Sequence, residues 1–419
     1  MGRRAGAKWA LISPFDQPAG PDPAGPDPAG RQLVGFELVR VSVPLRRPWA
    51  TASGSFSERD SLLVRAVVSL RDTNGDRQVM EGWGECGALP GPTYSSEYTA
   101  AATEVSERYL VPWLLRARVT RAAEVWPALS GARGHHMAKA AFEAALLDVE
   151  LRASGQSMAD YFSARSAGTQ PARAAVTAGV AVGLANDTHE LLDEVGEYVG
   201  YGYKRVKLKI SPERDAQAVS AVRKAWPDLV LFADANGSYQ TLSPTEATER
   251  LSALDDFGLA CLEQPLGADD LRGHAQLVRR LRTPICLDET LTSYNAVVTA
   301  LDTRACSVVN IKAGRLGGYL AAVRVHDLCA SRQVPVWCGG MVETGIARAA
   351  NVALAALPGF CLPGDLSATG RFFETDLTSP LPLRHDGTIA VPRGPGIGVV
   401  VDQEAVRLHC TWRYWWPAR

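Results

Sequence analysis

The feature that most constrains the fold is an alternation of short apolar segments and longer amphipathic segments after Pro171. Each apolar segment is too short for a buried helix and is followed by a charged stretch with helical periodicity, which is typical of a parallel sheet covered by helices. Eight such segments occur: AVTAGVAVG, KRVKLKI, LVLFADAN, GLACLEQP, TPICLDET, SVVNIKA, VPVWCGG and a weaker one around FCLPGD. Because eight parallel strands close a barrel, the pattern predicts a (β/α) barrel.

Helical periodicity fills the intervals between these segments, at 189–199, 213–226, 243–254, 270–281, 316–330 and 344–357. The alternative is an open doubly wound sheet, in which a Gly-x-Gly-x-x-Gly turn would follow the first strand. That fingerprint is missing here. The barrel, expected to occupy residues 170–375, is therefore favoured.

The chain before the barrel has a different pattern. Three strand-like runs lie between residues 33 and 85, with a turn at 72–76, and helical patterns follow at 96–115, 120–129 and 137–153. We interpret residues 33–165 as an α+β domain. Residues 1–32 contain AGPDP twice and predict a disordered or extended lead-in. Residues 376–419 are expected to return and pack on the α+β domain.

Composition excludes several classes of function. Forty-four basic and 45 acidic side chains leave a net charge of -1, which offers no electrostatic footprint for nucleic acid or an anionic membrane. The eight cysteines are scattered, without a C-x-x-C pair, and predict buried thiols in a reducing compartment. No apolar stretch has the length of a membrane span or a secretory signal. We therefore expect a cytoplasmic protein.

Charged residues occur late in five consecutive barrel strands. A charge inside a parallel barrel is costly unless it is paired or binds a metal, and the carboxyl ends of the strands converge on one rim. The intervals between successive positions are 25, 29, 25 and 24 residues, each about one strand-helix unit. In chain order the residues are Lys207 with Lys209, then Asp234, Glu263, Asp288 and Lys312.

Three neighbouring carboxylates would repel one another, so a cation is expected among them. Oxygen ligands without histidine or cysteine favour Mg²⁺, with Mn²⁺ as a substitute. Asp234 and Asp288 could instead each cap a helix, but three acids in register favour the metal. A dication would stabilise the enediolate formed when a proton is removed beside a carboxylate. Neighbouring cations would lower the pKa of a lysine enough to make it a base.

Several stretches carry a resemblance to a known family. They are KLKI, DANGSY, LEQP, LDET, NIKAGRLGG and WCGGMVETGIARAANVALAALPGF, with SERDSLLVR, EGWGECGALPGPTYSSEY and MAKAAFEAALLDVE in the N-terminal domain. The chain resembles the muconate lactonizing subgroup of the enolase superfamily, and within it the o-succinylbenzoate synthase / N-succinylamino acid racemase family, from about Val34 to Val401. The resemblance implies a (β/α)7β-type modified TIM barrel, an N-terminal capping domain and a C-terminal return to the cap.

The resemblance also implies roles for individual residues. Mg²⁺ would be bound by Asp234, Glu263 and Asp288, with Lys209 as base or acid on one face of the substrate and Lys312 on the other. The groups expected around them are Lys207 against the substrate carboxylate, Asn236 and Gln264 as hydrogen-bonding or structural amides, Glu289 orienting the site, and Gly339, Gly340 and Met341 lining the pocket.

The capping domain is expected to close over the rim. The loop from Thr51 to Arg59 and the segment around Tyr94 would exclude water, although a surface hairpin would give the same sequence pattern. Arg315 is a candidate partner for an anionic substrate tail. Ala347 and Ala350 stand where relatives commonly carry glycine and histidine, which affects the choice of substrate but not the metal or the lysines.

The resemblance implies an enzyme, a homo-oligomer acting on a small-molecule carboxylate. The first hypothesis is o-succinylbenzoate synthase, a lyase of menaquinone biosynthesis that dehydrates 2-succinyl-6-hydroxy-2,4-cyclohexadiene-1-carboxylate. The alternative is an N-succinylamino acid or N-acylamino acid racemase that uses the same two lysines. A dipeptide epimerase and a non-catalytic barrel are less favoured, since all six charged residues are present.

Overall fold

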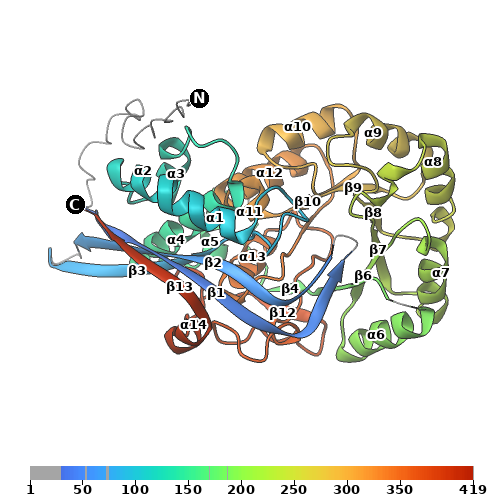
Figure 1. Ribbon diagram of the computed structural model, residues 1–419. Helices are drawn as coiled ribbons and strands as arrows, with labels where there is room; N and C mark the ends of the chain where they lie inside the picture. Colours follow the sequence, from blue (N-terminus) through green and yellow to red (C-terminus); the bar gives the residue numbers. More distant parts are fainter. Residues whose placement is uncertain (1–29, 52–53, 72–74, 169, 186, 419) are drawn as a thin grey trace, which may run out of the picture.

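A computed structural model describes residues 30–51, 54–71, 75–168, 170–185 and 187–418. A four-stranded antiparallel sheet with its helices forms one part of the molecule, and a curled parallel sheet surrounded by helices forms the other (Figure 1). The predicted lead-in lies almost wholly outside the described residues, as does most of the turn predicted at 72–76. In the described part of the chain, no helix is both long enough and apolar enough to span a membrane.

The antiparallel sheet of the cap brings together the first and the last strand of the described chain. Its strands are β1 (Gln32–Thr51), β2 (Gly54–Arg71), β3 (Arg77–Glu85) and β13 (Cys410–Pro417), in the order β13-β1-β2-β3. The C-terminal strand β13 pairs with β1 from Gly35 opposite Pro417 to Val41 opposite Cys410. Figure 1 shows this red strand beside the blue one. The predicted return of the chain to the cap is confirmed.

The helices of the cap follow β3. They are α1 (Thr99–Val105), the π-helix η1 (Ser106–Leu110), α2 (Val111–Arg116), α3 (Ala122–Ala128), α4 (His136–Ser154) and α5 (Met158–Arg165). The helix predicted over 96–115 is present as one continuous helical stretch from Thr99 to Arg116, with a π-helical segment in its middle. Pro112 lies just after this segment and has no N–H to donate within the α-helical hydrogen-bond pattern. The helix α5 was not predicted.

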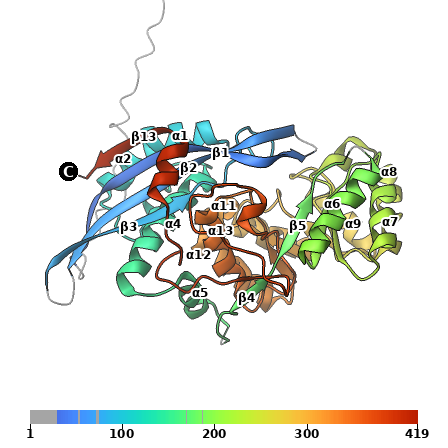
Figure 2. The same cartoon turned by 90° about the horizontal axis from the view of Figure 1, so that it is seen from below.

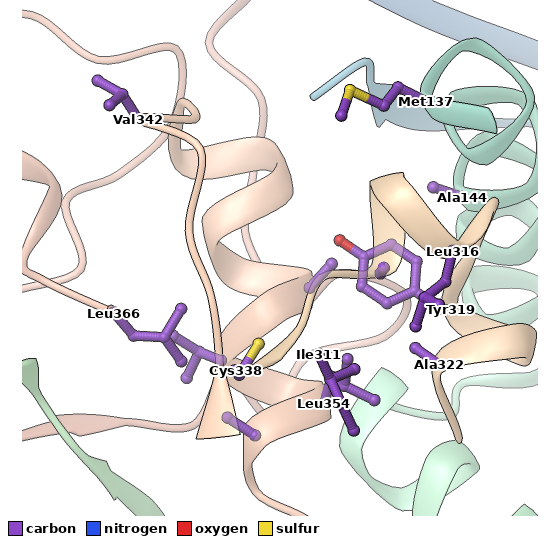
Figure 3. Close-up of a cluster of buried hydrophobic side chains, with 14 of the residues drawn as sticks. Met137, Ala144, Ile311, Leu316, Tyr319, Ala322, Cys338, Val342, Leu354 and Leu366 are labelled. Carbon is purple, nitrogen blue, oxygen red and sulfur yellow. The ribbon is translucent and has the colours of Figure 1, made fainter. Parts of the chain in front are cut away.

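The helix α4 connects the cap to the barrel and is buried along nearly its whole length. Its alanines allow close approach to β3, where a Cβ added to Gly84 would overlap the carbonyl oxygen of Ala141. Met137 and Ala144 on α4 face Leu316 and Tyr319 of the barrel (Figure 3). This shared apolar core fixes the cap over one side of the barrel.

The parallel sheet has seven strands, in the order β11-β10-β9-β8-β7-β6-β5. They are β5 (Gly179–Val182), β6 (Arg205–Lys209), β7 (Val230–Asp234), β8 (Cys261–Glu263), β9 (Ile285–Leu287), β10 (Val308–Ile311) and β11 (Val336–Cys338). A separate pair, β4 (Ala175–Thr177) and β12 (Thr388–Ala390), lies outside this sheet. The predicted modified barrel with a capping domain is confirmed.

Helices alternate with these strands as predicted. They are α6 (Thr188–Tyr201), α7 (Asp215–Ala225), α8 (Pro244–Ser252), α9 (Leu271–Arg280), α10 (Tyr294–Asp302), α11 (Ala313–Leu316), α12 (Tyr319–Ser331) and α13 (Gly345–Ala355). Short 3₁₀ turns occur at η2 (Ser238–Thr241), η3 (Asp255–Phe257) and η4 (Thr369–Arg371), and α14 (Gln403–His409) precedes β13. The helix α10 lies in an interval predicted to be helical, although no range was given for it, and α14 was not predicted.

The eighth apolar segment does not form a regular strand. The backbone N–H groups of Leu362 and Asp365 donate to carbonyl oxygens of Val336 and Cys338 on β11, at 3.3 and 3.0 Å. Pro363 between them has no N–H to donate, so a continuous ladder cannot form. The prediction of an eighth regular strand is wrong, although the extended segment occupies the corresponding position beside β11.

A buried acid in α4 gives a prediction for stability. Glu143 Oε1 accepts from the backbone N–H of Leu320 at 3.0 Å, and burial raises the pKa of Glu143 to about 8. The folded protein then holds a proton that the unfolded chain releases, so the free energy of unfolding should fall as pH rises from about 5 to 8, by up to several kcal/mol, since a tenfold change in proton affinity is worth about 1.4 kcal/mol.

Urea unfolding of the wild type and Glu143→Gln across this pH range measures the effect. The variant should show the flatter profile, because glutamine does not titrate. Identical pH profiles for the two proteins would refute the shifted pKa.

Candidate active site

The predicted charged residues meet at the carboxyl ends of β6 to β10. Lys209 lies opposite Asp234 in the β6–β7 register, and Asp234 lies opposite Glu263 in the β7–β8 register. Glu263 is opposite Cys286, which places Asp288 two residues farther along on the same side of β9. With Lys312 directly after β10, these side chains come from five adjacent strands. Most of them line a cavity of about 210 Å³.

On one side of the cavity, the two lysines of β6 contact the acids. Lys207 Nζ lies 2.6 Å from Glu263 Oε2 and 2.9 Å from Asp234 Oδ2. Lys209 Nζ donates to Asp234 Oδ2 at 2.7 Å and to Asn236 Oδ1 at 2.5 Å. Alternation along β6 explains why both ammonium groups point inward, as predicted.

On the other side, Lys312 and Arg315 share one acid. Lys312 Nζ donates to Asp288 Oδ2 at 2.9 Å and to the hydroxyl of Tyr94 at 3.2 Å. Arg315 Nη1 donates to Asp288 Oδ1 and, at 2.9 Å, to Tyr94. The Arg315 side chain is buried in this contact, and its role as a partner for an anionic substrate tail stays a prediction.

Two amides and an acid complete the network. Asn236 Nδ2 donates to Glu289 Oε1 at 2.8 Å, so Glu289 holds the amide that contacts Lys209. Gln264 Oε1 accepts from the backbone N–H of Asp288 at 3.0 Å, and its Nε2 donates to Thr290 Oγ1 at 2.8 Å. Gln264 is therefore a structural support for the Asp288 turn.

Burial and the neighbouring ammonium groups shift the pKa values of the acids in opposite directions. Burial and the neighbouring Asp234 raise the pKa of Glu263 to about 7. Burial also tends to raise the pKa of Asp234, but the ammonium groups of Lys207 and Lys209 outweigh it and hold that pKa well below its usual range. The two carboxylates thus differ in proton affinity although they occupy adjacent strands.

Two lysines of the site have raised pKa values. Burial tends to lower the pKa of Lys207, but Asp234, Asp365 and Glu263 raise it well above the ordinary value. Lys312 is also raised, because the effects of Tyr94 and nearby acids exceed that of burial. The predicted lowering depended on a cation among the acids, whereas here the carboxylates contact the ammonium groups directly.

The glycines after β11 make room for the site. A Cβ added to Gly339 would lie 2.6 Å from Lys312 Cε and closer still to Asn310 Oδ1. Gly340, Met341 and Val342 line the cavity itself. Val342 has a positive φ of 57°, which is unusual for a β-branched residue. Gly340 and Met341 thus lie in the cavity wall, while Gly339 packs against Lys312 from behind.

Gly339→Ala should therefore displace Lys312 and lower kcat by about 10- to 100-fold, since an error of about 1 Å in a catalytic group can cost 100-fold. The matched control is Gly200→Ala in α6, where an added Cβ has no neighbour within 4 Å. Steady-state kinetics with thermal unfolding distinguishes the two. Wild-type kcat in Gly339→Ala would show that Lys312 does not need this space.

The cap supplies the outer wall of the cavity. In Figure 2 the β1–β2 hairpin extends from the cap toward β5 and α6, and Arg47 near its end pairs with Glu197 of α6 at 2.8 Å. Trp49 and Tyr94 line the cavity. The predicted loop from Thr51 to Arg59 is instead mostly strand, because β2 begins at Gly54; residues 52–53 lie outside the described residues.

Sequence reasoning missed three groups at or beside the site, of which Asn310 and Arg348 are buried and Asp365 is partly buried. Asp365 lies 2.6 Å from Lys207 Nζ, and Asn310 Nδ2 donates to Glu263 Oε1 at 2.7 Å. Arg348 Nη1 donates to the carbonyl oxygen of Asp365 at 2.8 Å and fixes that backbone. Two of them could have been found: Asp365 ends the eighth apolar segment, and Asn310 precedes Lys312 by two residues on the same strand face.

The acids Asp234, Glu263 and Asp288 are the candidate ligands for a metal ion. Among the described residues, no three acidic, histidine or cysteine side chains are gathered at metal-binding distances, since each acid is turned to an ammonium or guanidinium group. The acids nevertheless share one layer, and Glu289 Oε2 is buried without a hydrogen-bond partner. An all-oxygen set on adjacent strands fits a hard dication.

Each part of the chain matches the model of a known protein family. The family described as mandelate racemase / muconate lactonizing enzyme, N-terminal domain, matches residues 34–162, and the enolase C-terminal domain-like family matches residues 190–405. An N-succinylamino acid racemase from Amycolatopsis sp is 48% identical over 90% of this chain and 98% of its own length. An o-succinylbenzoate synthase from Geobacillus kaustophilus is 41% identical, over 88% and 93%.

A solved structure of the same superfamily has the same fold as this chain. A member of the enolase superfamily from Listeria innocua superposes with a TM-score of 0.82 at 34% identity, covering 93% of this chain and all of that one. Enzymes of this family generally depend on a divalent metal ion and act on small-molecule carboxylates. The chain belongs to the o-succinylbenzoate synthase / N-succinylamino acid racemase family of the enolase superfamily.

Proposed function

We propose that this enzyme removes the proton next to a substrate carboxylate, with Lys209 and Lys312 acting on opposite faces of the same carbon. The observation that carries the proposal is the placement of the two lysines. Lys209 ends β6 and Lys312 follows β10, with three strands between them, and both line one cavity. A small carboxylate bound between them would present one face to each ammonium group.

Asp234, Glu263 and Asp288 are the residues proposed to hold the metal, and Mg²⁺ is the proposed ion. When bound, it supplies the positive charge that offsets the charge gained by the substrate carboxylate. Asn236 and Glu289 hold Lys209 in place, and Tyr94 holds Lys312, so that each lysine keeps its direction toward the substrate. Lys207 is proposed to contact the substrate carboxylate.

The first proposed reaction is that of o-succinylbenzoate synthase. In its neutral amine form, Lys209 accepts at Nζ the proton next to the ring carboxylate of 2-succinyl-6-hydroxy-2,4-cyclohexadiene-1-carboxylate and becomes an ammonium group. The bond from the ring to the hydroxyl oxygen then breaks, and the departing hydroxide takes the proton from the Lys209 ammonium group as water. Both steps occur on one face, so a single base suffices, and Lys312 stabilises the intermediate as a cation.

The second proposed reaction is racemisation of an N-succinylamino acid, which the 48% identity to the Amycolatopsis sp racemase favours. One lysine removes the α proton and the other returns a proton to the opposite face. This reaction needs both lysines, whereas the dehydration needs one. The same cavity therefore supports both, and the ratio of rates identifies the main activity.

The test is to offer the purified protein both substrates, with Mg²⁺ and with excess chelator. We expect kcat/KM to be measurable for at least one reaction with Mg²⁺, to fall to background with chelator and to return when Mg²⁺ is added back. Full activity after exhaustive chelation would refute the metal-dependent proposal. The larger kcat/KM assigns the principal reaction.

We also propose that the protein is a homo-oligomer in the cytoplasm and has no nucleic-acid or membrane partner. Its proposed domains are residues 33–165, 170–375 and 376–419. All eight cysteines are free, which supports a reducing compartment. Size-exclusion chromatography with light scattering tests the oligomeric state.

A further inference from the structure

Lys207 is a competitor for the proposed metal ligands. Its ammonium group lies 2.9 Å from Asp234 Oδ2 and 2.6 Å from Glu263 Oε2. These are the carboxylates that would have to turn to a metal ion. The Lys207 ammonium group and a metal ion therefore compete for the same carboxylate oxygen atoms. The affinity for the metal depends on how easily Lys207 moves away from them.

Asp365 provides a third acceptor for the same ammonium group. Its Oδ2 lies 2.6 Å from Lys207 Nζ, as close as Glu263. Asp365 follows the eighth apolar segment, beyond the three strands that carry the proposed ligands, so it draws Lys207 toward a different side of the barrel. Its carboxylate remains available to Lys207 when the other two are occupied.

The other contacts of Asp365 fix it in this position. Its backbone N–H donates to Cys338 at 3.0 Å, and its carbonyl oxygen accepts from Arg348 at 2.8 Å. Its Oδ1 accepts from Arg205, whose fully buried guanidinium group lies 4.0 Å from the ring centroid of Phe232. Burial tends to raise the pKa of Asp365, but Arg205 and Lys207 hold it well below its usual range.

We infer that Asp365 is a positioning residue that retains the Lys207 ammonium group when Asp234 and Glu263 turn to a divalent metal ion, and thereby favours metal binding. The inference rests on the proposed function, because it takes those acids as metal ligands. Without the Asp365 carboxylate, Lys207 has only the two ligand carboxylates as anionic partners. A metal ion then has to displace it from both.

The experiment is calorimetric titration of substrate-free wild type and Asp365→Asn with Mn²⁺. We expect the variant to bind Mn²⁺ about 10- to 100-fold more weakly, the range typical of residues that orient metal ligands. Asp302→Asn is the matched control, since Asp302 is an exposed acid paired with Arg332, and it should bind Mn²⁺ as the wild type does.

A second pair of variants separates this effect from a folding defect, because Asp365→Asn leaves Arg205 without its anionic partner. Arg205→Met removes that buried charge while the backbone contacts of Asp365 remain, and it should retain Mn²⁺ affinity. Adding Asp365→Asn to Arg205→Met should weaken Mn²⁺ binding by the same factor as in the wild-type background. Far-UV circular dichroism verifies that each variant is folded.

Asp234→Asn distinguishes failure of the inference from failure of the proposed function. If Asp234→Asn loses Mn²⁺ binding while Asp365→Asn, alone and with Arg205→Met, binds like its parent protein, the positioning role is refuted and the metal site stands. If Asp234→Asn leaves Mn²⁺ affinity unchanged, the proposed metal site itself is wrong.

Discussion

Lys209→Ala is expected to lower kcat/KM for both dehydration and racemisation by about 10²- to 10⁴-fold, the contribution typical of a positioned general acid or base. The physical reason is that both proposed reactions begin with proton transfer at a carbon atom, and Lys209 is assigned one face of that carbon. Its ammonium group is fixed by Asp234 and Asn236, so no neighbouring amine can take its place without rearrangement.

The control for this prediction is Lys204→Ala, which removes an exposed amine just before the same strand. It should leave both specificity constants within about twofold of the wild type, since it contacts neither the cavity nor the proposed ligands. Steady-state kinetics with each substrate provides the measurement. Near-normal turnover by Lys209→Ala would remove the proposed base from the mechanism.

Lys312→Ala should separate the two reactions. Racemisation should fall by about 10²- to 10⁴-fold because the second face of the carbon loses its acid or base. Dehydration proceeds on the face assigned to Lys209, so its loss should be smaller and should reflect the missing positive charge alone. The ratio of the two specificity constants is therefore the informative quantity.

Chiral chromatography for racemisation and absorbance of the aromatic product for dehydration measure this ratio. Lys224→Ala, at an exposed position of α7, is the control for a general loss of positive charge. Equal losses of both reactions in Lys312→Ala would contradict the assignment of one face to each lysine.

The barrel and its rim of charges could be predicted because strand alternation and buried charge are both local properties of the sequence. Lys207 and Lys209 stand two residues apart, and that spacing alone places both on one face of β6. The acids at the ends of β7, β8 and β9 follow the same logic. These residues lie where the sequence predicted them, on adjacent strands around one cavity.

Contacts between distant segments could not be predicted in the same way. The contact of Arg315 with Asp288 depends on how α11 turns after β10, and Tyr94 reaches both of them from the cap. Periodicity within one segment contains no information on such contacts. The pairing of β13 with β1 is also long-range, and its exact register is visible only in the folded chain.

Secondary-structure elements that are short or interrupted were the hardest to predict from the sequence. The helix α10 has only nine residues, and α5 has eight, so each gives little periodic signal. The apolar composition of the eighth segment predicts a strand, but Pro363 interrupts its row of backbone donors. Asp365 stands at the end of that segment. The expectation that a charged residue at the end of a barrel strand lies at the rim, which holds for Asp234, Glu263 and Asp288, applies to Asp365 as well.

The most direct measurement is hydrogen exchange at the α carbon in D₂O, followed by NMR for each enantiomer of an N-succinylamino acid. With two lysines on opposite faces of one carbon, Lys209→Ala should exchange one enantiomer and Lys312→Ala the other, while neither interconverts them. Exchange of both enantiomers by either folded variant, or of the same enantiomer by both, would contradict the arrangement.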